Sequence, residues 1–148
     1  MSVNPRLGRS VLYASIALLL LVAIVVATVV IPSVKADISP RATPAEAAAA
    51  FWVNTIVDCV VASILLLIAV RVRFRSPALT TCLLILGVVI LLFGFALYDA
   101  ARAFKHLPTT SALLVACSVA TLLTAVLACV SAFLLPKRTK HENQANPG

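Results

Sequence analysis

The sequence contains few charged residues: only 11% of its 148 residues are Asp, Glu, Lys or Arg, and five of these are acidic. Soluble domains carry about a quarter charged residues and about half apolar ones. This chain is instead 62% hydrophobic, with a mean hydropathy of +1.10. A soluble fold of this size has too little interior to bury so much apolar surface. We therefore expect lipid to cover part of the molecule.

Residue patterns typical of catalysis and metal binding are also missing. The sequence has no Ser/His/Asp set, no Gly-rich phosphate loop and no pair of carboxylates within an apolar run. The two histidines are His106 and His141, and the topology derived from the apolar runs puts them on opposite sides of a membrane. We therefore expect no enzyme activity, no catalytic residue, no cofactor and no metal site.

The four cysteines form no C-x-x-C pair, and each lies inside an apolar run. They are Cys59, Cys82, Cys117 and Cys129. Because the usual spacing of metal ligands is absent, we expect reduced, buried thiols that pack as small hydrophobic side chains.

The net charge of +7 would suggest nucleic-acid binding in a soluble chain. Here no Lys/Arg run is interleaved with aromatic residues, and the basic residues flank apolar segments. Basic residues in that position orient membrane spans and contact anionic lipid head groups. The predicted partner is therefore the lipid bilayer, and not nucleic acid.

Four apolar runs are long enough to cross a bilayer. The first has 21 residues without a charge, about 31 Å of helix, which matches the hydrocarbon thickness. The four runs cover residues 11–31, 51–70, 78–98 and 111–135. They predict an all-α integral membrane protein with a four-transmembrane-helix antiparallel bundle. Residues 1–10 would form an N-terminal tail, 11–136 the transmembrane domain and 137–148 a disordered tail.

Helix boundaries are marked by prolines and a capping pattern. Pro32 is expected to end the first helix. Thr43, Pro44 and Glu46 form a capping box that starts the second helix. The third run follows Ser76 and Pro77, and the fourth ends before a further proline.

The orientation of the chain in the membrane follows from its twelve lysines and arginines. Eight of them lie in the two tails and in the connection between the second and third runs, which share one side of the membrane. Because basic residues are enriched on the cytoplasmic side, both termini are predicted to be cytoplasmic, in a multi-pass protein of the cell (inner or plasma) membrane. The cytoplasmic basic residues include Arg71, Arg73, Arg75, Lys137 and Arg138.

The first run also has features of a signal peptide, because Arg6 and Arg9 precede it and Val34-Lys35-Ala36 resembles a cleavage site. The apolar region of a signal peptide is typically about 7–15 residues long, and this run is longer. We therefore favour an uncleaved first span. Cleavage would leave three spans with the same orientation.

Small residues repeat at helical spacing in the last two spans. Gly87 and Gly94 lie seven residues apart on one face. In a bilayer, small residues permit the close helix approach that stabilises a bundle. The fourth span carries a stripe that we expect to face the other helices: Ser111, Ser118, Thr121, Ala125, Ala128 and Ala132.

Asp58 is the only ionisable residue that we place inside the hydrocarbon, about 10 Å below the outer surface if the core begins near Phe51. Asn54 precedes it by four residues on the same helix face. Ser118 and Thr121 of the fourth span reach a similar depth and are the expected hydrogen-bond partners. The predicted intramembrane polar cluster is Asn54, Asp58, Ser118 and Thr121, with Thr55 and Thr28 at its margin.

Aromatic and basic residues mark the expected membrane interface. Phe51 and Trp52 lie at the head of the second run, and Tyr98 and Arg102 at the end of the third. Arg102 is separated from Asp58 by about 16 Å along the helix axes. We therefore expect Arg102 to pair with Asp99 or with lipid phosphate.

Two functions fit these observations. A lone buried carboxyl group without further buried ionisable residues favours a structural role over a transport route. The preferred hypothesis is a small polytopic membrane protein that acts as a non-catalytic accessory or assembly subunit or as a membrane scaffold, with other membrane subunits or itself as partners. The alternative is a small oligomeric transporter or channel-like protein that uses Asp58.

Overall fold

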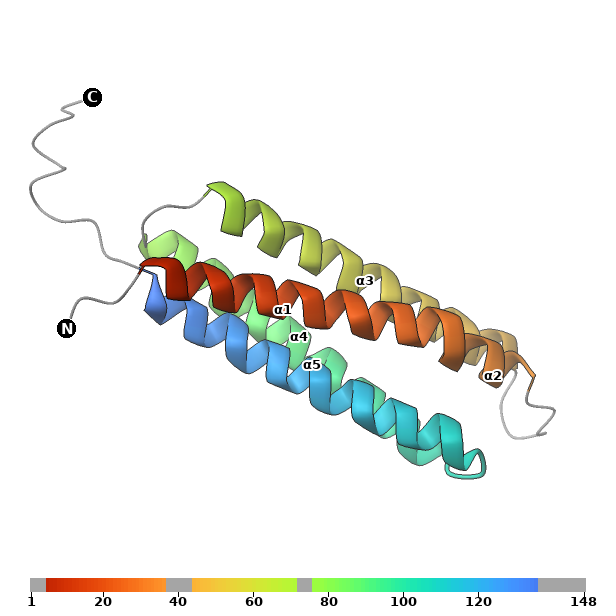
Figure 1. The fold of residues 1–148 in the computed structure, drawn as a ribbon. Helices are drawn as coiled ribbons and strands as arrows, with labels where there is room; N and C mark the ends of the chain where they lie inside the picture. The colour runs from red at the N-terminus through yellow and green to blue at the C-terminus, as the bar shows by residue number, and fades with distance from the viewer. Residues whose placement is uncertain (1–4, 37–43, 72–75, 136–148) are drawn as a thin grey trace, which may run out of the picture.

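The computed structural model describes residues 5–36, 44–71 and 76–135. They form four long helical rods (Figure 1). The first rod consists of α1 (Pro5–Val25), the π-helical segment η1 (Val26–Val30) and α2 (Ile31–Lys35), and the others are α3 (Pro44–Arg71), α4 (Pro77–Ala103) and α5 (Pro108–Leu134). Each of the four rods is long and apolar enough to span a membrane, as the sequence predicted.

Four of the helices begin on a proline, which is well suited to a first helical position because its missing N–H needs no partner there. These residues are Pro5, Pro44, Pro77 and Pro108. At the start of α4, the Ser76 hydroxyl also accepts a hydrogen bond of 3.1 Å from the Leu79 N–H. The predicted helix start at Pro44 is confirmed, while Thr43 of the capping box lies outside the described residues.

Pro32 does not end the first rod, so that prediction was wrong. The helix runs through Pro32 to Lys35, and the turn before the proline widens into η1. There the Ile31 N–H donates to the Val26 carbonyl, five residues back. A proline ring clashes with the carbonyl four residues before it in an α-helix, and a π-turn relieves such a conflict by changing the local spacing.

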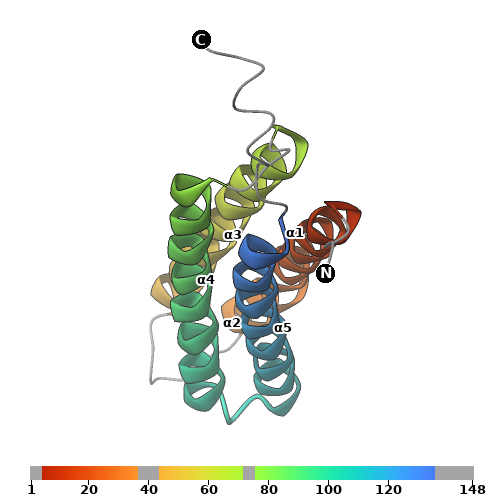
Figure 2. The ribbon, with the colours of Figure 1, turned by 90° about the vertical axis from the view of Figure 1, so that its left-hand side faces the viewer.

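The four rods form two layers that are joined on one side only. α4 and α5 lie side by side in one layer, and α1 and α3 lie behind them in the other (Figure 2). The first rod packs against both α3 and α5, whereas α3 and α4 barely touch. The order around the bundle is therefore α3, α1, α5, α4, with an opening between α3 and α4.

Neighbouring rods run in opposite directions, and α1 begins where α5 ends (Figure 1). The two helices approach closely at this end. A Cβ atom added to Gly8 would lie 3.2 Å from the carbonyl carbon of Leu134. The antiparallel arrangement of four helices is therefore as predicted.

The predicted small-residue stripe of α5 is turned into the bundle, and part of it meets α4 next to the two glycines. A Cβ atom on Gly94 would lie 2.9 Å from Cδ2 of Leu122, and one on Gly87 would lie 2.5 Å from Sγ of Cys129. The Ser111 hydroxyl donates to the Ala101 carbonyl at 2.8 Å. Except for the half-buried Ser111, every residue of the stripe is buried: Ser118, Thr121, Ala125, Ala128 and Ala132.

The prediction that all four thiols are buried was wrong for two of the cysteines. Cys117 is buried and Cys129 is partly buried, whereas Cys59 and Cys82 are exposed on the outer faces of α3 and α4. An apolar run gives no strong signal about which face of a helix is turned inward, because lipid-facing positions are as apolar as buried ones.

Candidate functional site

A layer of polar side chains separates two apolar clusters inside the bundle. One cluster contains Leu12, Leu65 and Leu83, and the other contains Phe51 and Leu114. The polar layer between them consists of buried residues of α3 and α5: Asn54, Thr55, Asp58, Ser118, Thr121 and Thr124.

The α3 half of this layer is held together within the helix. Asn54 and Asp58 are one turn apart, and the Asn54 Nδ2 atom donates to the Asp58 Oδ2 atom at 3.1 Å. Asp58 is only 2% exposed. It lies near the middle of the apolar span Glu46–Arg71, about 18 Å along the axis from Glu46 and about 20 Å from Arg71. The sequence correctly predicted that these two side chains share one face.

The α5 hydroxyls form other bonds than predicted. Ser118 donates to the Gly94 carbonyl of α4 at 2.8 Å, and Thr121 donates to the Cys117 carbonyl of its own helix at 2.8 Å. The expected donation from these hydroxyls to Asp58 was therefore wrong. Thr121 has a carbonyl of its own helix within reach, and such a local acceptor competes with side chains on other helices. Ser118 instead meets the Gly94 carbonyl of the adjacent α4.

One member of the layer, Thr124, was missed in the sequence. Thr124 is buried and donates to the Ala120 carbonyl at 2.9 Å. Its position three residues after Thr121 on the same face was the available signal. Cys117, next to Ser118 on α5, is buried in the apolar cluster that contains Phe51.

Thr28 does not belong to the layer. Its side chain is exposed, and its hydroxyl donates to the Ile24 carbonyl at 2.7 Å. The rod turns this residue outward just where η1 alters the helical spacing.

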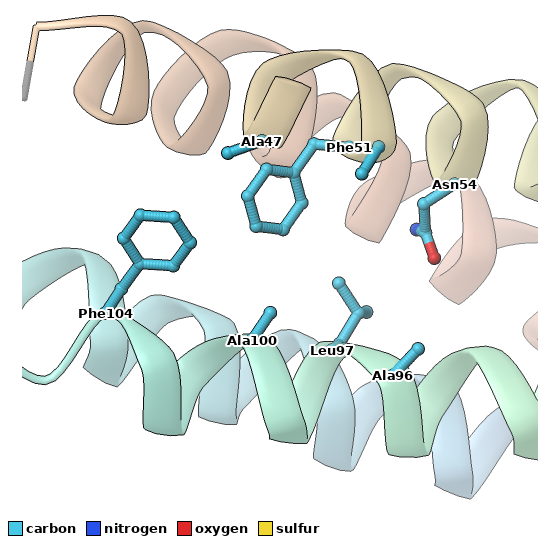
Figure 3. A pocket seen from close by; sticks show the side chains of 8 residues that line it. Ala47, Phe51, Asn54, Ala96, Leu97, Ala100 and Phe104 are labelled. Carbon is cyan, nitrogen blue, oxygen red and sulfur yellow. The ribbon is translucent and has the colours of Figure 1, made fainter. Parts of the chain in front are cut away.

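A cleft of about 180 Å³ opens beside the polar layer, between α3 and α4 (Figure 3). The rings of Phe51 and Phe104, with centroids 6.0 Å apart, bridge the two helices at one end. The lining is otherwise mostly alanine, with Asn54 as its polar member: Ala47, Ala50, Asn54, Ala96, Leu97 and Ala100. Because Phe51 is 5% exposed, it packs inside the bundle and differs from the expected interfacial anchor.

The other expected anchors are exposed. Trp52 and Tyr98 have about half of their surface free, at 45% each. The guanidinium carbon of Arg102 lies 5.9 Å from the centroid of the Tyr98 ring. Arg102 thus makes a cation–π contact one turn back along α4, in place of the predicted pair with Asp99.

Of the five basic residues predicted on the cytoplasmic side, Arg71 is exposed at the end of α3. The remaining four lie outside the described residues: Arg73, Arg75, Lys137 and Arg138.

Within the described ranges, no three His, Cys, Asp or Glu side chains are grouped so that they could hold a metal ion. The polar layer instead presents one carboxyl group and one amide next to a cleft, an arrangement that suits a hydrogen-bond donor or a cation. No protein-family model, no curated protein and no solved structure matches the chain.

The bond between Ser118 and Gly94 allows a direct test of the α4–α5 contact. We expect Ser118→Ala to lower the free energy of unfolding by about 0.6 kcal/mol, the average for a polar contact between membrane helices. Titration of the micellar protein with sodium dodecyl sulfate measures this change. Ser63→Ala is the matched control, since the exposed Ser63 hydroxyl bonds only within α3. Equal effects of the two substitutions would contradict a role of Ser118 between helices.

Proposed function

We propose that this protein is a non-catalytic accessory or assembly subunit, or a scaffold, of the cell membrane. The observation that carries the proposal is the opening of the bundle between α3 and α4. In lipid no hydrophobic force draws helices together, and close packing of small residues drives their association instead. The alanine-lined faces of α3 and α4 at this opening are such a surface. The open side leaves apolar helix surfaces free to contact other membrane subunits or a second copy.

The inventory of polar groups supports a binding role over a transport role. Among the described helices, Asp58 is the one carboxyl group in the interior. Transport routes normally contain several buried ionisable groups or broken helices at the substrate site. In this bundle the Ser and Thr hydroxyls of the polar layer donate to backbone carbonyls instead.

The distribution of basic residues supports a cytoplasmic location of both termini. α1 begins and α5 ends at the same end of the bundle (Figure 1), which is consistent with this orientation. The same end is reached by Arg71 at the end of α3.

The second candidate function is a small oligomeric transporter or channel that uses Asp58. The observation in its favour is the position of this carboxyl group near the middle of an apolar span. A carboxylate at such a depth costs about 3 kcal/mol or more and is often functional for that reason.

A flux measurement separates the two functions. The purified protein and the variant Asp58→Asn are reconstituted into liposomes that contain a pH-sensitive dye. For a subunit without transport activity, we expect neither protein to raise proton or cation flux above that of protein-free liposomes. A flux that is present in the wild type and lost in Asp58→Asn would overturn the proposal in favour of the transporter.

A purification in mild detergent tests the subunit function itself. We expect a stoichiometric complex with another membrane protein or a defined oligomer of this chain. The proposal would be contradicted if the protein extracted from native membranes were a monodisperse monomer at every detergent concentration tested.

A further inference from the structure

We propose that the cleft between α3 and α4 is the docking site for a transmembrane helix of another protein, and that this helix carries a single lysine that reaches Asn54 and Asp58. The inference rests on the proposed subunit function and names the chemistry of the partner. It follows from the size of the cleft, from the polar side chain of Asn54 at its inner side and from the neighbouring carboxyl group of Asp58.

The cleft has the dimensions of a side chain. Pockets for small organic ligands typically measure about 300–1,000 Å³, whereas this cleft measures about 180 Å³. Its rims are formed by Ala47 and Ala50 of α3 and by Ala96 and Ala100 of α4. Small residues at these spacings allow the backbone of a further helix to come close. A helix that inserts one long side chain therefore fits better than a small molecule.

Asn54 provides an unused acceptor at the inner side of the cleft. The residue is 6% exposed, and its Nδ2 atom is bonded to Asp58. Its Oδ1 atom has no donor among the described residues and turns toward α4 (Figure 3). An acceptor in an apolar environment is stabilised when a donor reaches it, so the occupant should present an N–H or O–H group here.

The charge of the surroundings favours a cationic donor. Asp58 lies one helical turn further along α3, is 2% exposed and accepts the amide hydrogen bond of Asn54. An ammonium group has three donors and no acceptor, so it can bond the Asn54 oxygen directly while the adjacent Asp58 carboxylate balances its charge. Opposite charges that meet in a low-dielectric environment attract strongly, and intramembrane ionisable residues usually pair in this way.

A second copy of this chain does not provide such a group. In the described part of the chain, the lysines and arginines all lie within two turns of a rod end or in a connection. Asp58, in contrast, is near the middle of α3. The lysine must therefore come from a different protein, at a depth close to the middle of its own span.

The single tryptophan of the chain permits a test without knowledge of the natural partner. Trp52 is exposed and adjoins Phe51, which lines the cleft. The probe is a synthetic Leu/Ala transmembrane peptide with a dansyl group and one central lysine. Its counterpart carries norleucine, which has a similar length and no charge, in place of the lysine. Energy transfer from Trp52 to the dansyl group is measured in phosphatidylcholine vesicles as the peptide concentration rises.

We expect the lysine peptide to associate about tenfold more tightly than the norleucine peptide, within the range found for polar contacts between model membrane peptides. Asp58→Asn should remove this difference while keeping the shape of the side chain. Ala96→Phe fills the cleft without changing a charge and should abolish association of the lysine peptide. Val88→Phe, on an exposed face of α4 away from the cleft, is the matched control and should leave association unchanged.

Equal association of the two peptides with the wild type would overturn the docking site, and so would a lysine preference that survives Ala96→Phe. Circular dichroism of each variant verifies that the helices are retained. A natural complex that persists in the Ala96→Phe variant would disprove this site while leaving the subunit function intact. Lysine-dependent binding in vesicles combined with a strictly monomeric protein from native membranes would instead disprove the subunit function.

Discussion

Replacing Gly94 with leucine is expected to push α4 away from α5 and to lower the free energy of unfolding by about 3 kcal/mol, at the upper end for overpacked interiors. A Cβ atom at this position would already lie 2.9 Å from Cδ2 and 3.0 Å from Cγ of Leu122. The displaced backbone would also lose the bond from Ser118 to the Gly94 carbonyl. Unfolding by sodium dodecyl sulfate in mixed micelles, followed by circular dichroism, measures the change.

Ala116→Leu is the matched control, because Ala116 is exposed on the outer face of α5 and enlarging it does not change the contact between α4 and α5. We expect a change of less than about 0.5 kcal/mol there. Gly87→Ala should be milder than Gly94→Leu, since the Cys129 Sγ atom that it approaches moves with one side-chain rotation. A Gly94→Leu variant as stable as Ala116→Leu would show that α4 and α5 do not pack through this glycine.

The second large effect concerns the bond between Asn54 and Asp58. We expect Asn54→Leu to destabilise the protein by about 3 kcal/mol, because it leaves a buried carboxyl group without its donor. Asp58→Leu added to Asn54→Leu removes both partners, and the double variant should recover to within about 1 kcal/mol of the wild type. A double-mutant cycle in the same detergent titration gives the coupling energy of the pair.

Ser63→Leu controls for the general effect of exchanging a polar residue of α3 for leucine, since Ser63 is exposed. It should be nearly neutral. Additive losses in the Asn54 and Asp58 variants, with no recovery in the double variant, would show that the two side chains do not stabilise the helix as a pair.

The parts of this fold that depend on spacing along one helix were predictable. Gly87 and Gly94 are seven residues apart, and the polar pair Asn54 and Asp58 is four apart, so each pair must share a face. Neither conclusion requires knowledge of the neighbouring helix. The four apolar rods follow from composition in the same way.

What the sequence did not predict depends on competition between partners or on which helices become neighbours. Ser118 and Thr121 were expected to meet the carboxyl group of Asp58, but α3 and α5 are not adjacent in the bundle, and both hydroxyls donate to backbone carbonyls. Phe51 packs against Phe104, which directly follows α4, and so faces the bundle. The cleft exists because α3 packs on α1 and not on α4, a choice that no single helix reveals.

The order of the helices around the bundle also affects how the protein can assemble during synthesis. The ribosome releases the chain from its N-terminus, so α1 and α3 exist before α4 and α5. The two layers are joined through contacts between the first rod and α5, the last helix to be made. Until α5 emerges, the paired α1 and α3 present their inner faces, including Asp58, to whatever surrounds the nascent chain. During biogenesis, the inner faces of α1 and α3 must therefore stay free of other contacts until α5 has been made.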